Sequence, residues 1–467
     1  MPRSTAGAVD RTTSGLLLEV DLSGVARGGR AGTLASQLRR AVRTGTLPAG
    51  TRLPSSRTLA SDLGVSRGVI VNAYDQLVAE GYLVGRRGSG TIVASGTDPG
   101  PPAPLRPVTR PSNPGLPSGG SFPRASWARC AARALTTLTD DELGYGDAAG
   151  LPRLREELAR YLGRVRAVVA QPDRIVIVNG FAQASRLVAD VLRSGGTPQI
   201  GVEDPGSIGL RDQLTASGLT CVPIPVDGEG IQVDALVASS VRAVVVTPAH
   251  QFPTGAVTSP ARRHALLDWA RSRRGLVVED DYDAEFRYDR TPIGALQGLG
   301  PDVVLYGGSV SKTLAPGVRL GWLVVPEHLV ATYRDAKYTA DLARGVLAQA
   351  TFAELLASGD MDRHIRRTAM EYRRRRDHLV AAVAACLPDW EVTGTAAGLH
   401  LVLHPPAGHD ETLAQQAQTC GLDARPLSRY TLGSPRRTGL VVGYGHQPPG
   451  TLTAAVEALA RVLSREH

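Results

Sequence analysis

Hydrophobic residues follow two different spacings along this chain of 467 residues. Between residues 31 and 95 they recur every three to four positions, as at Leu34, Leu38 and Val42, which is the spacing of amphipathic helices. From about residue 121 onwards, short continuous apolar runs alternate with helical patterns. Continuous runs predict strands buried on both faces, and therefore a mostly parallel sheet flanked by helices. The four clearest runs are 174–178, 242–246, 275–280 and 303–308.

The stretch between these two patterns, residues 96–120, is rich in proline, glycine and serine. Such a composition builds no hydrophobic core and is typical of an extended spacer. A chain of 467 residues is also too long for one core. We therefore expect an N-terminal domain at 31–95, a spacer at 96–120 and a larger domain at 121–467. Residues from roughly 335 onwards are expected to form a smaller subdomain of the larger domain.

The N-terminal pattern predicts three helices and a hairpin. The second helix follows Pro54-Ser55-Ser56 and ends at Gly64, and the third begins with Ser66 as its cap and ends at Gly81. Two helices joined by a tight turn that contains glycine form a helix-turn-helix, whose second helix enters the major groove of DNA. Strand-like residues on both sides of Gly85–Gly90 predict a hairpin, or wing.

Basic residues are unevenly distributed. Residues 30–95 hold nine arginines and three acidic residues, a large part of the net charge of +8. A compact basic module suggests a polyanionic partner, although a solvated basic surface is an equal alternative on charge alone. Of the 52 basic residues, only Lys312 and Lys337 are lysines. A lysine amine can lose its proton and attack an aldehyde, which arginine cannot do, so Lys312 is a candidate for covalent chemistry.

Several functional classes find little support. The four cysteines have neither metal nor disulfide spacing, and no apolar stretch is long enough for a membrane span. We therefore expect a cytoplasmic protein with no membrane association. His400 and His404 could share a strand face, but they lack a cysteine or carboxylate partner in the sequence, and we expect no metal. Arg373–Arg376 lies in a helical pattern and is expected to form a solvated face.

One segment has the features of a phosphate site. A predicted strand runs into Gly180, Phe181 and Ala182, where a helix begins. Backbone N–H groups at the start of a helix bind anions, and a glycine allows a phosphate to approach closely. Hydroxyl and guanidinium groups that would complete the site belong to Ser309, Ser311 and Arg319.

The other groups that pyridoxal 5'-phosphate (PLP) requires are also present. Asp280 and Tyr282 lie two positions apart on a predicted strand and share a face, whereas Asp281 points to the opposite face. A carboxylate at that place would keep the pyridine nitrogen protonated, and the phenol would meet the 3'-oxygen. Lys312 would bind the aldehyde as a Schiff base. Together these residues predict a PLP site.

The N-terminal segment resembles the GntR-type winged helix. The resemblance rests on Gly50–Arg57 (GTRLPSSR), Leu63–Arg67 (LGVSR), Glu80–Leu83 (EGYL) and Gly88–Thr91 (GSGT). It implies binding to operator DNA; the alternative is a small helical domain with surface arginines. By this resemblance, the DNA-binding residues would be Arg52, Arg57, Ser66, Arg67, Arg86 and Gly90.

About 340 residues of the C-terminal part resemble the fold-type-I aminotransferases. Matching residues include Tyr145-Gly146-Asp147 and Pro253-Thr254-Gly255 besides the PLP residues. In that family the first tyrosine reaches the phosphate of the partner subunit, which implies that Tyr145 binds cofactor and that the protein is a homodimer. The implied fold is an α/β domain with a large, mostly parallel sheet and a small C-terminal α+β subdomain.

The two resemblances together are those of the MocR/GabR regulators. In these proteins a GntR-like winged helix is fused to an aminotransferase-like domain, which makes the chain a multidomain α+β protein. The segments His250–Pro253 (HQFP), Glu279–Tyr288 (EDDYDAEFRY) and Ala397–His400 (AGLH) are similar to that subfamily in particular.

Three positions depart from the aminotransferase pattern. Phe252 stands where those enzymes have an asparagine that supports the 3'-oxygen, and Ser207 where many relatives have a tyrosine. Val441 stands where an arginine grips the substrate carboxylate. Loss of that charge-assisted pair removes roughly 1.5–3 kcal/mol of binding. We therefore expect a regulator without physiological turnover that senses PLP itself, like the PdxR branch, and controls vitamin B6 synthesis or salvage.

Other functions stay open at this point. Arginines from nearby loops could replace the missing one, namely Arg429, Arg436 or Arg437. The chain would then be a GabR-like sensor in which an amino acid or amine displaces Lys312. It could also be an aminotransferase with an added regulatory module, or a DNA-binding protein with an inactive aminotransferase scaffold.

Overall fold

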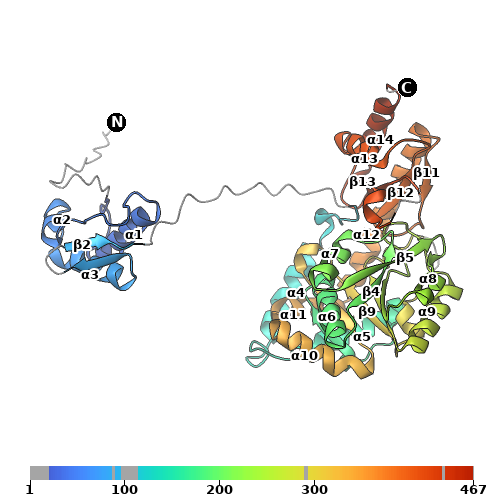
Figure 1. Cartoon of the computed structure of the whole chain (residues 1–467), viewed down its shortest axis with the longest axis horizontal. Helices are drawn as coiled ribbons and strands as arrows, with labels where there is room; N and C mark the ends of the chain where they lie inside the picture. The colour runs from blue at the N-terminus through green and yellow to red at the C-terminus, as the bar shows by residue number, and fades with distance from the viewer. Residues whose placement is uncertain (1–19, 87–89, 96–113, 289–292, 434–436, 466–467) are drawn as a thin grey trace. The chain divides into compact units, whose positions relative to one another are not determined.

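The computed structural model describes residues 20–86, 90–95, 114–288, 293–433 and 437–465. Contacts between Cα atoms divide the chain into two units, Met1–Arg110 and Pro111–His467 (Figure 1). Within the described ranges, no helix is both long enough and apolar enough to cross a membrane.

The N-terminal unit is a winged helix-turn-helix, as the sequence predicts. Its elements are η1 (Arg27–Gly29), α1 (Arg30–Arg43), α2 (Ser56–Asp62), α3 (Arg67–Ala79), β1 (Leu83–Arg86) and β2 (Gly90–Val93). The two strands pair antiparallel, and an isolated bridge between Arg52 and Ile92 adds the segment before α2 to the hairpin. Residues 87–89 of the predicted wing lie outside the described residues.

The predicted apolar positions form the core of this unit. Leu34 and Leu38 of α1 pack in one cluster with Ile70 and Leu77 of α3. The Oγ atom of Ser55 accepts a hydrogen bond from the backbone N–H of Thr58 at 3.1 Å and caps α2.

Ser66 is the N-cap of α3, as the sequence predicts, but its hydroxyl makes no cap hydrogen bond. The backbone N–H of Val69 donates to the Ser66 carbonyl at 3.0 Å. The Ser66 side chain therefore satisfies none of the N–H groups at the exposed start of α3.

In the described part of the C-terminal unit, eight strands form one sheet in the order β3-β10-β9-β8-β7-β4-β5-β6. β5, β4, β7, β8 and β9 run parallel to one another. β10 pairs antiparallel with β9 and β3, and β6 pairs antiparallel with β5. The sheet is therefore mostly parallel, as expected. The strands are β3 (Ile175–Val178), β4 (Gln199–Asp204), β5 (Thr220–Asp227), β6 (Gly230–Ile231), β7 (Ala243–Val246), β8 (Leu276–Asp281), β9 (Val304–Ser309) and β10 (Gly321–Val324).

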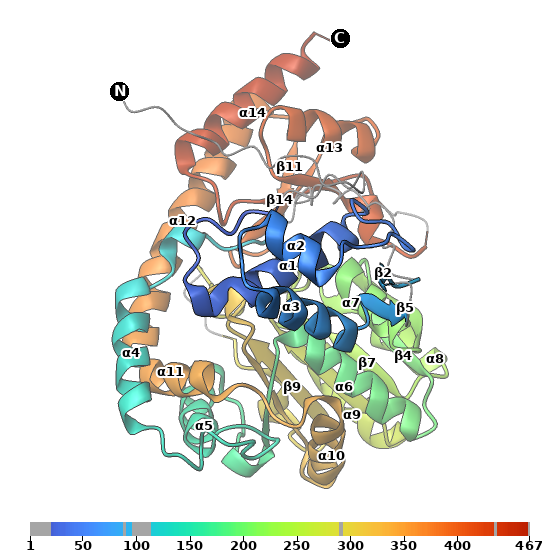
Figure 2. The same ribbon diagram turned by 90° about the vertical axis from the view of Figure 1, so that its left-hand side faces the viewer.

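Helices cover both faces of this sheet (Figure 2). Val245 of β7 packs in the cluster that contains Leu187 of α6, whereas Val244 and Val246 pack in the cluster that contains Leu267 of α9. Continuous apolar strands are therefore explained by burial on both sides. The helices are α4 (Arg124–Thr137), α5 (Pro152–Arg166), α6 (Phe181–Ser194), α7 (Ile208–Ala216), α8 (Val233–Ala238), α9 (Pro260–Arg273), α10 (Val330–Asp341) and α11 (Val346–Ala357).

The last hundred residues form a smaller α+β layer on a four-stranded antiparallel sheet in the order β11-β12-β14-β13. Its hydrophobic cluster joins Tyr372 and Leu379 of α12 to Phe286 and Tyr288 of the segment after β8, whereas Tyr333 of α10 packs in the core of the large sheet. The elements are α12 (Asp360–Cys386), β11 (Glu391–Thr393), β12 (His400–His404), α13 (Asp410–Thr419), β13 (Ala424–Pro426), β14 (Leu440–Gly443) and α14 (Pro449–Leu463).

One part of the expected arginine surface on α12 is buried. Arg373 and Arg374 are exposed, but Arg375 is only 6% exposed. Its guanidinium donates to the Gly445 carbonyl, pairs with Glu371 and lies 5.5 Å from the ring centroid of Tyr372. A helix of 27 residues that crosses the small layer must bury one stripe, and Arg375 falls on it.

Candidate functional site

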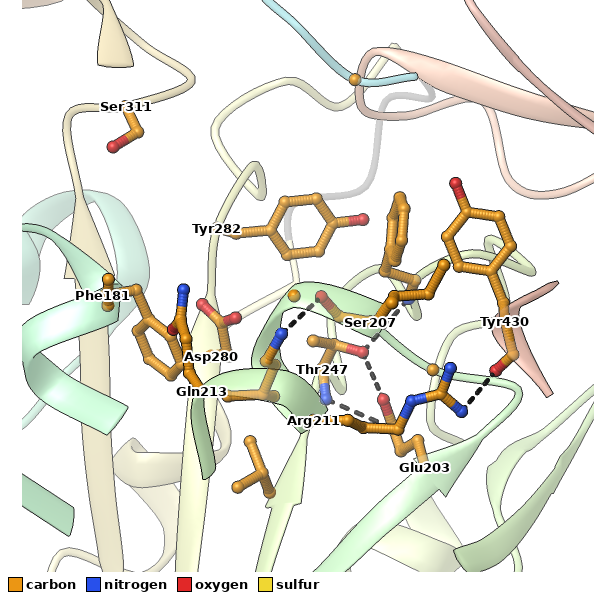
Figure 3. A pocket seen from close by; sticks show the side chains of 18 of the residues that line it. Phe181, Glu203, Ser207, Arg211, Gln213, Thr247, Asp280, Tyr282, Ser311 and Tyr430 are labelled. Atoms are coloured by element: carbon orange, nitrogen blue, oxygen red, sulfur yellow. Dashed lines mark hydrogen bonds between the residues drawn. The ribbon is translucent and has the colours of Figure 1, made fainter. Parts of the chain in front are cut away.

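A cavity of about 350 Å³ lies at the carboxyl ends of the parallel strands, where open α/β sheets bind ligands (Figure 3). Eight of the ten residues predicted to bind cofactor line it, and Tyr145 and Gly180 do not. Tyr145 is 82% exposed on its own chain. The eight that line the cavity are Phe181, Ala182, Asp280, Tyr282, Ser309, Ser311, Lys312 and Arg319.

Gly180 lies behind the predicted phosphate end. It stands at the N-cap of α6 with φ of 71°, a conformation that favours glycine. The Arg319 guanidinium packs against it, 3.3 Å from where a Cβ atom would stand, and donates to the Asn179 carbonyl at 2.5 Å. Ser311 donates from its backbone N–H to the Ser309 hydroxyl at 3.4 Å. A helix start, a fixed guanidinium and hydroxyls fit a phosphate group.

The carboxylates of β8 alternate as the strand pattern predicts. Asp281 faces away from the cavity, where it pairs with Arg166 at 2.8 Å and accepts from the Tyr306 hydroxyl at 2.7 Å. Asp280 faces the cavity (Figure 3). Its pKa lies well above the usual range, first because of burial and then because of the charges of Asp281 and Asp283. A protonated pyridine nitrogen would supply the positive charge that this carboxyl lacks.

Lys312 also lines the cavity. Its ammonium donates to the Gly115 carbonyl at 2.8 Å. Burial lowers its pKa from the usual value, and the charges of Asp283 and Asp280 oppose this effect. A larger fraction of neutral amine favours attack on an aldehyde. The residues present therefore fit PLP, which would supply that aldehyde and an electron-withdrawing ring.

Residues 114 and 115 belong to this site although the sequence places them in the spacer. Pro114 and Gly115 are buried and line the cavity. A Cβ atom on Gly443 would lie 2.9 Å from the Cα atom of Pro114, so a glycine in β14 makes room for this segment. Proline-rich composition identified a spacer but not the point at which it enters the packed domain.

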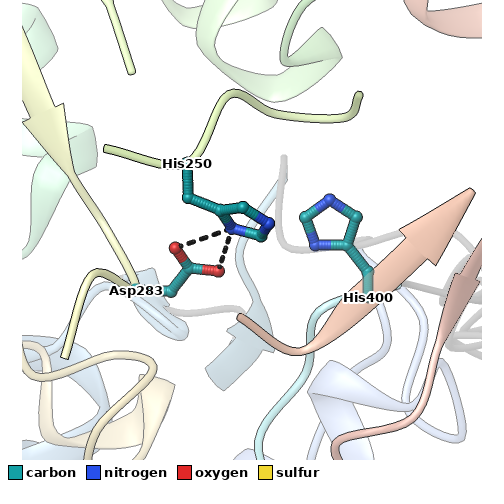
Figure 4. Close-up of side chains that lie close together, drawn as sticks. All are labelled: His250, Asp283 and His400. Atoms are coloured by element: carbon teal, nitrogen blue, oxygen red, sulfur yellow. Dashed lines mark hydrogen bonds and ion pairs between the residues drawn. The ribbon is translucent and has the colours of Figure 1, made fainter. Parts of the chain in front are cut away.

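The sequence analysis also missed a buried network beside Tyr282. The Nδ1 atom of His250 lies 3.0 Å from one Asp283 oxygen (Figure 4) and 3.1 Å from the Tyr282 hydroxyl. Burial and the neighbouring carboxylates raise the pKa of Tyr282 well above its usual value, so it is a neutral phenol. His250 thus supports the phenol from within HQFP, where Phe252 replaces the asparagine of the aminotransferases. In the sequence, the only sign of this network is Asp283, which directly follows Tyr282 in EDDYDAEFRY.

His400 completes this cluster, whereas His404 does not belong to it. One ligand atom each from His250, Asp283 and His400 lies within 4.8 Å of the others. The Nε2 atom of His400 lies 3.1 Å from the Pro253 carbonyl, and burial lowers the pKa of His400 to about 3. His404 instead lies 2.7 Å from the Thr438 carbonyl. The two histidines lie on the same strand, β12, but they contact different neighbours.

Of the arginines proposed from the sequence to replace the one lost at Val441, the two that the structure describes, Arg429 and Arg437, do not line the cavity. Arg429 is exposed, Arg437 pairs with Glu391, and Arg436 lies outside the described residues. Besides Arg319, two arginines line the cavity, Arg211 and Arg425. Neither was distinguishable in the sequence from the many surface arginines.

Ser207 lines the cavity at the start of α7. Its Oγ atom accepts a hydrogen bond from the Leu210 N–H at 3.4 Å and caps the helix. The position that carries a tyrosine in many aminotransferases therefore has a capping role here, and it leaves more room in the cavity.

The residues predicted to bind DNA lie on the N-terminal unit. Arg52, Arg57, Ser66 and Arg67 are all exposed. Arg67 donates from Nε to the Ser56 hydroxyl at 3.2 Å, which joins the starts of α2 and α3. Gly90 has φ of 85°, and a Cβ atom there would lie 3.4 Å from Nε of Arg52. Arg86 ends β1.

Comparison with known proteins identifies both units. Residues 30–93 match the bacterial regulatory proteins of the gntR family, and residues 118–457 match the aminotransferases of class I and II. The probable rhizopine catabolism regulatory protein MocR of Rhizobium meliloti is 34% identical over 454 residues, which cover 91% of this chain and 92% of that protein. The chain belongs to the MocR-type regulators of the GntR family.

Other relatives agree with the MocR-type architecture. The HTH-type pyridoxine biosynthesis transcriptional regulator PdxR of Corynebacterium glutamicum is 33% identical over 449 residues, which cover 92% of this chain and 95% of PdxR. Among solved structures, the kynurenine aminotransferase of Pyrococcus horikoshii superposes with a TM-score of 0.69 at 25% identity, over 76% of this chain and 90% of that one. The GntR unit indicates DNA binding, and the aminotransferase unit indicates PLP binding.

Proposed function

We propose that this MocR-type chain is a transcriptional regulator whose operator binding is controlled by PLP bound at Lys312. The observation that carries the proposal is the hydrogen bond of 2.8 Å from the Lys312 ammonium to the Gly115 carbonyl. Gly115 follows the stretch 96–113, which connects the cofactor unit to the DNA-binding unit. A change at the Lys312 amine therefore acts directly on the segment from which this connection starts.

The coupling follows from the number of hydrogen-bond donors. A free lysine ammonium has three N–H donors, and Gly115 uses one of them. A lysine nitrogen joined to the cofactor aldehyde would keep at most one N–H in place of three, which favours release of the Gly115 carbonyl. A buried carbonyl without a partner costs about 1–3 kcal/mol, which is enough to shift the conformation of residues 114–116.

On DNA, the start of α3 would enter the major groove with Ser66 and Arg67, while Arg52, Arg86 and Gly90 would lie at the wing. We further propose a homodimer, because two half-sites require two winged helices. The exposure of Tyr145 supports this: a phenol that is 82% exposed beside the exposed Leu143 is suited to reach the cofactor of a partner subunit.

Two effectors are candidates. Direct sensing of PLP, with control of vitamin B6 synthesis or salvage, is supported by Val441 at the place of the carboxylate-binding arginine and by the likeness to PdxR. An amino acid or amine that acts on the PLP-bound protein is the second candidate, and the position of Arg425 favours it. Neither version requires physiological transamination, and the relatives MocR and PdxR are both named as regulators.

The test is a titration of PLP-free protein with PLP. Binding of a DNA fragment from the region beside the gene is measured together with the absorbance of the bound cofactor. We expect DNA affinity or the footprint to change in parallel with cofactor absorbance in the wild type, and both changes to be lost in Lys312→Ala. Cofactor binding without any effect on DNA would overturn the proposal. Turnover of an amino donor with 2-oxoglutarate would favour the aminotransferase alternative.

A further inference from the structure

The cavity walls formed by the described residues carry three guanidinium groups with different surroundings. Arg319 is held by the Asn179 carbonyl at 2.5 Å beside the phosphate end. Arg211 is buried and donates to the carbonyls of Tyr430 at 3.0 Å and Arg429 at 3.2 Å. Both of these arginines are therefore fixed by the backbone. The third, Arg425, is only partly buried.

Arg425 has a phenol beside it. Its positive charge acts on the Tyr430 hydroxyl, and Tyr430 also lines the cavity. Burial nevertheless raises the pKa of Tyr430 to about 12, so the phenol keeps its proton. Within the part of the chain that the structure describes, no carboxylate oxygen lies within 4.0 Å of the Arg425 guanidinium. A partly desolvated cation at a cavity wall without an anionic partner favours an anionic ligand.

The strand register explains how Arg425 reaches the cavity. β13 and β14 pair antiparallel, and Arg425 lies directly opposite Val441. Directly opposite residues of an antiparallel pair share a face. The Val441 side chain packs with Tyr430 and Phe252, and these two residues line the cavity. Arg425 therefore extends from the face, and from the place, at which the expected arginine is missing from β14.

We infer that Arg425 and Tyr430 form a binding site for a carboxylate at the side of the cavity opposite the phosphate end. The planar guanidinium matches a carboxylate with two parallel hydrogen bonds, and the Tyr430 hydroxyl is a further donor. The effector is then a small amino carboxylate, with its amine near Lys312 and its carboxylate at Arg425. This inference rests on the proposed function and specifies the second of its two effectors.

The size of the cavity limits the ligand. A volume of about 350 Å³ lies near the lower end of the range for small-molecule sites, roughly 300–1,000 Å³. It suits PLP with a compact amino acid and excludes a peptide.

The experiment compares amino carboxylates with the amines that lack the carboxylate. Full-length protein loaded with PLP is titrated with 4-aminobutyrate against butylamine, and with alanine against ethylamine, and cofactor absorbance is recorded. We expect at least one amino carboxylate to bind more tightly than its amine. In Arg425→Met, that preference should fall roughly ten- to hundredfold, as expected for a charge-assisted pair. Arg429→Met, in which an exposed side chain outside the cavity is changed, should keep it.

A second variant separates a binding role from a structural one. Val441→Arg in the Arg425→Met background returns a guanidinium to the same face from the opposite strand. We expect it to restore part of the preference for the carboxylate, which a merely structural role of Arg425 does not predict. PLP absorbance of each variant checks that the pocket is intact.

The outcomes distinguish the two proposals. If PLP-loaded Arg425→Met binds the amino carboxylates as the wild type does, or if no amino carboxylate binds more tightly than its amine, the carboxylate site is overturned while PLP-dependent DNA binding can still hold. If PLP and amino carboxylates bind without any effect on DNA, the regulatory function fails while the assignment of Arg425 stands.

Discussion

At the residue scale, the cofactor unit buries several ionisable side chains, both acidic and basic. Glu203 of β4 is a clear case, because it lines the cavity and its carboxyl accepts hydrogen bonds from the Thr247 N–H at 3.2 Å and the Thr247 hydroxyl at 2.5 Å. Burial raises the pKa of Glu203 to about 7, although these hydrogen bonds oppose the shift. Such a group makes the stability of the unit depend on pH near neutrality.

The sign follows from the raised pKa. Below the usual glutamate pKa, Glu203 is protonated in the folded and unfolded states, and the cost of burying its charge is absent. As the pH rises from there to about 7, the unfolded state ionises while Glu203 of the folded state stays protonated, and up to roughly 3 kcal/mol of unfolding free energy is lost. We expect Glu203→Gln to reduce the loss of stability between pH 5 and pH 8, measured by urea unfolding. Glu411→Gln, at an exposed position of α13, should keep the wild-type loss. Equal pH dependence of all three proteins would contradict this prediction.

At the element scale, the start of α6 combines three requirements: a sharp turn out of β3, N–H groups directed at the cavity, and space for Arg319. Gly180 satisfies them with φ of 71° and no side chain. A methyl group there would stand 3.3 Å from the Arg319 guanidinium. We expect Gly180→Ala to displace Arg319 and to weaken PLP binding by roughly tenfold or more, in line with losing one charge-assisted hydrogen bond.

The control for this substitution is Gly450→Ala at the start of α14, where a Cβ atom would meet no atom within 4 Å. Titration with PLP by absorbance compares the two variants. An unchanged affinity in Gly180→Ala would show that the backbone of α6, and not the position of Arg319, dominates phosphate binding.

In the N-terminal unit, the start of α3 is the site at which we propose that phosphates bind. We expect Arg67→Ala to weaken DNA binding and to reduce the slope of log affinity against log salt by about one, as expected for one lost phosphate contact. Arg271→Ala removes an arginine that pairs with Asp302 on the surface of the other unit, and it should leave the slope unchanged. Equal slopes for Arg67→Ala and the wild type would remove Arg67 from the interface.

At the scale of the whole molecule, the proposed dimer makes a prediction that a monomer cannot meet. Tyr145 does not line the cavity of its own chain, so the contact that we propose between Tyr145 and the cofactor would come from a partner subunit. We expect Lys312→Ala to abolish covalent PLP binding and Tyr145→Ala to weaken PLP binding. Co-refolded mixtures of the two variants should regain up to one native pocket per mixed dimer, measured by absorbance.

Either variant refolded alone is the control for this mixture. Sedimentation of the wild type provides an independent check. A monomer in solution, or a mixture that behaves as the average of its parts, would rule out shared sites.

The fold could be predicted from the spacing of apolar residues. Strands buried on two faces have continuous apolar runs, and helices buried on one face have apolar residues with a period near 3.6. The PLP residues could be predicted for a similar reason: Asp280, Tyr282 and Lys312 lie in short segments whose strand and turn geometry depends on local sequence. Local rules were incomplete at Ser66, which is the N-cap of α3 but makes no cap hydrogen bond through its hydroxyl, and they failed at Arg375, which is buried in an arginine run.

The sequence by itself therefore determined the two-unit organisation, the mostly parallel sheet and eight of the residues that line the cavity. Only the tertiary structure decided which residues meet from distant segments. Arg425 reaches the cavity because it lies opposite Val441 across two strands, and Gly115 reaches Lys312 from almost two hundred residues away. The physical reason is that such contacts depend on strand register and layer packing, which bring together positions that share no local spacing in the chain.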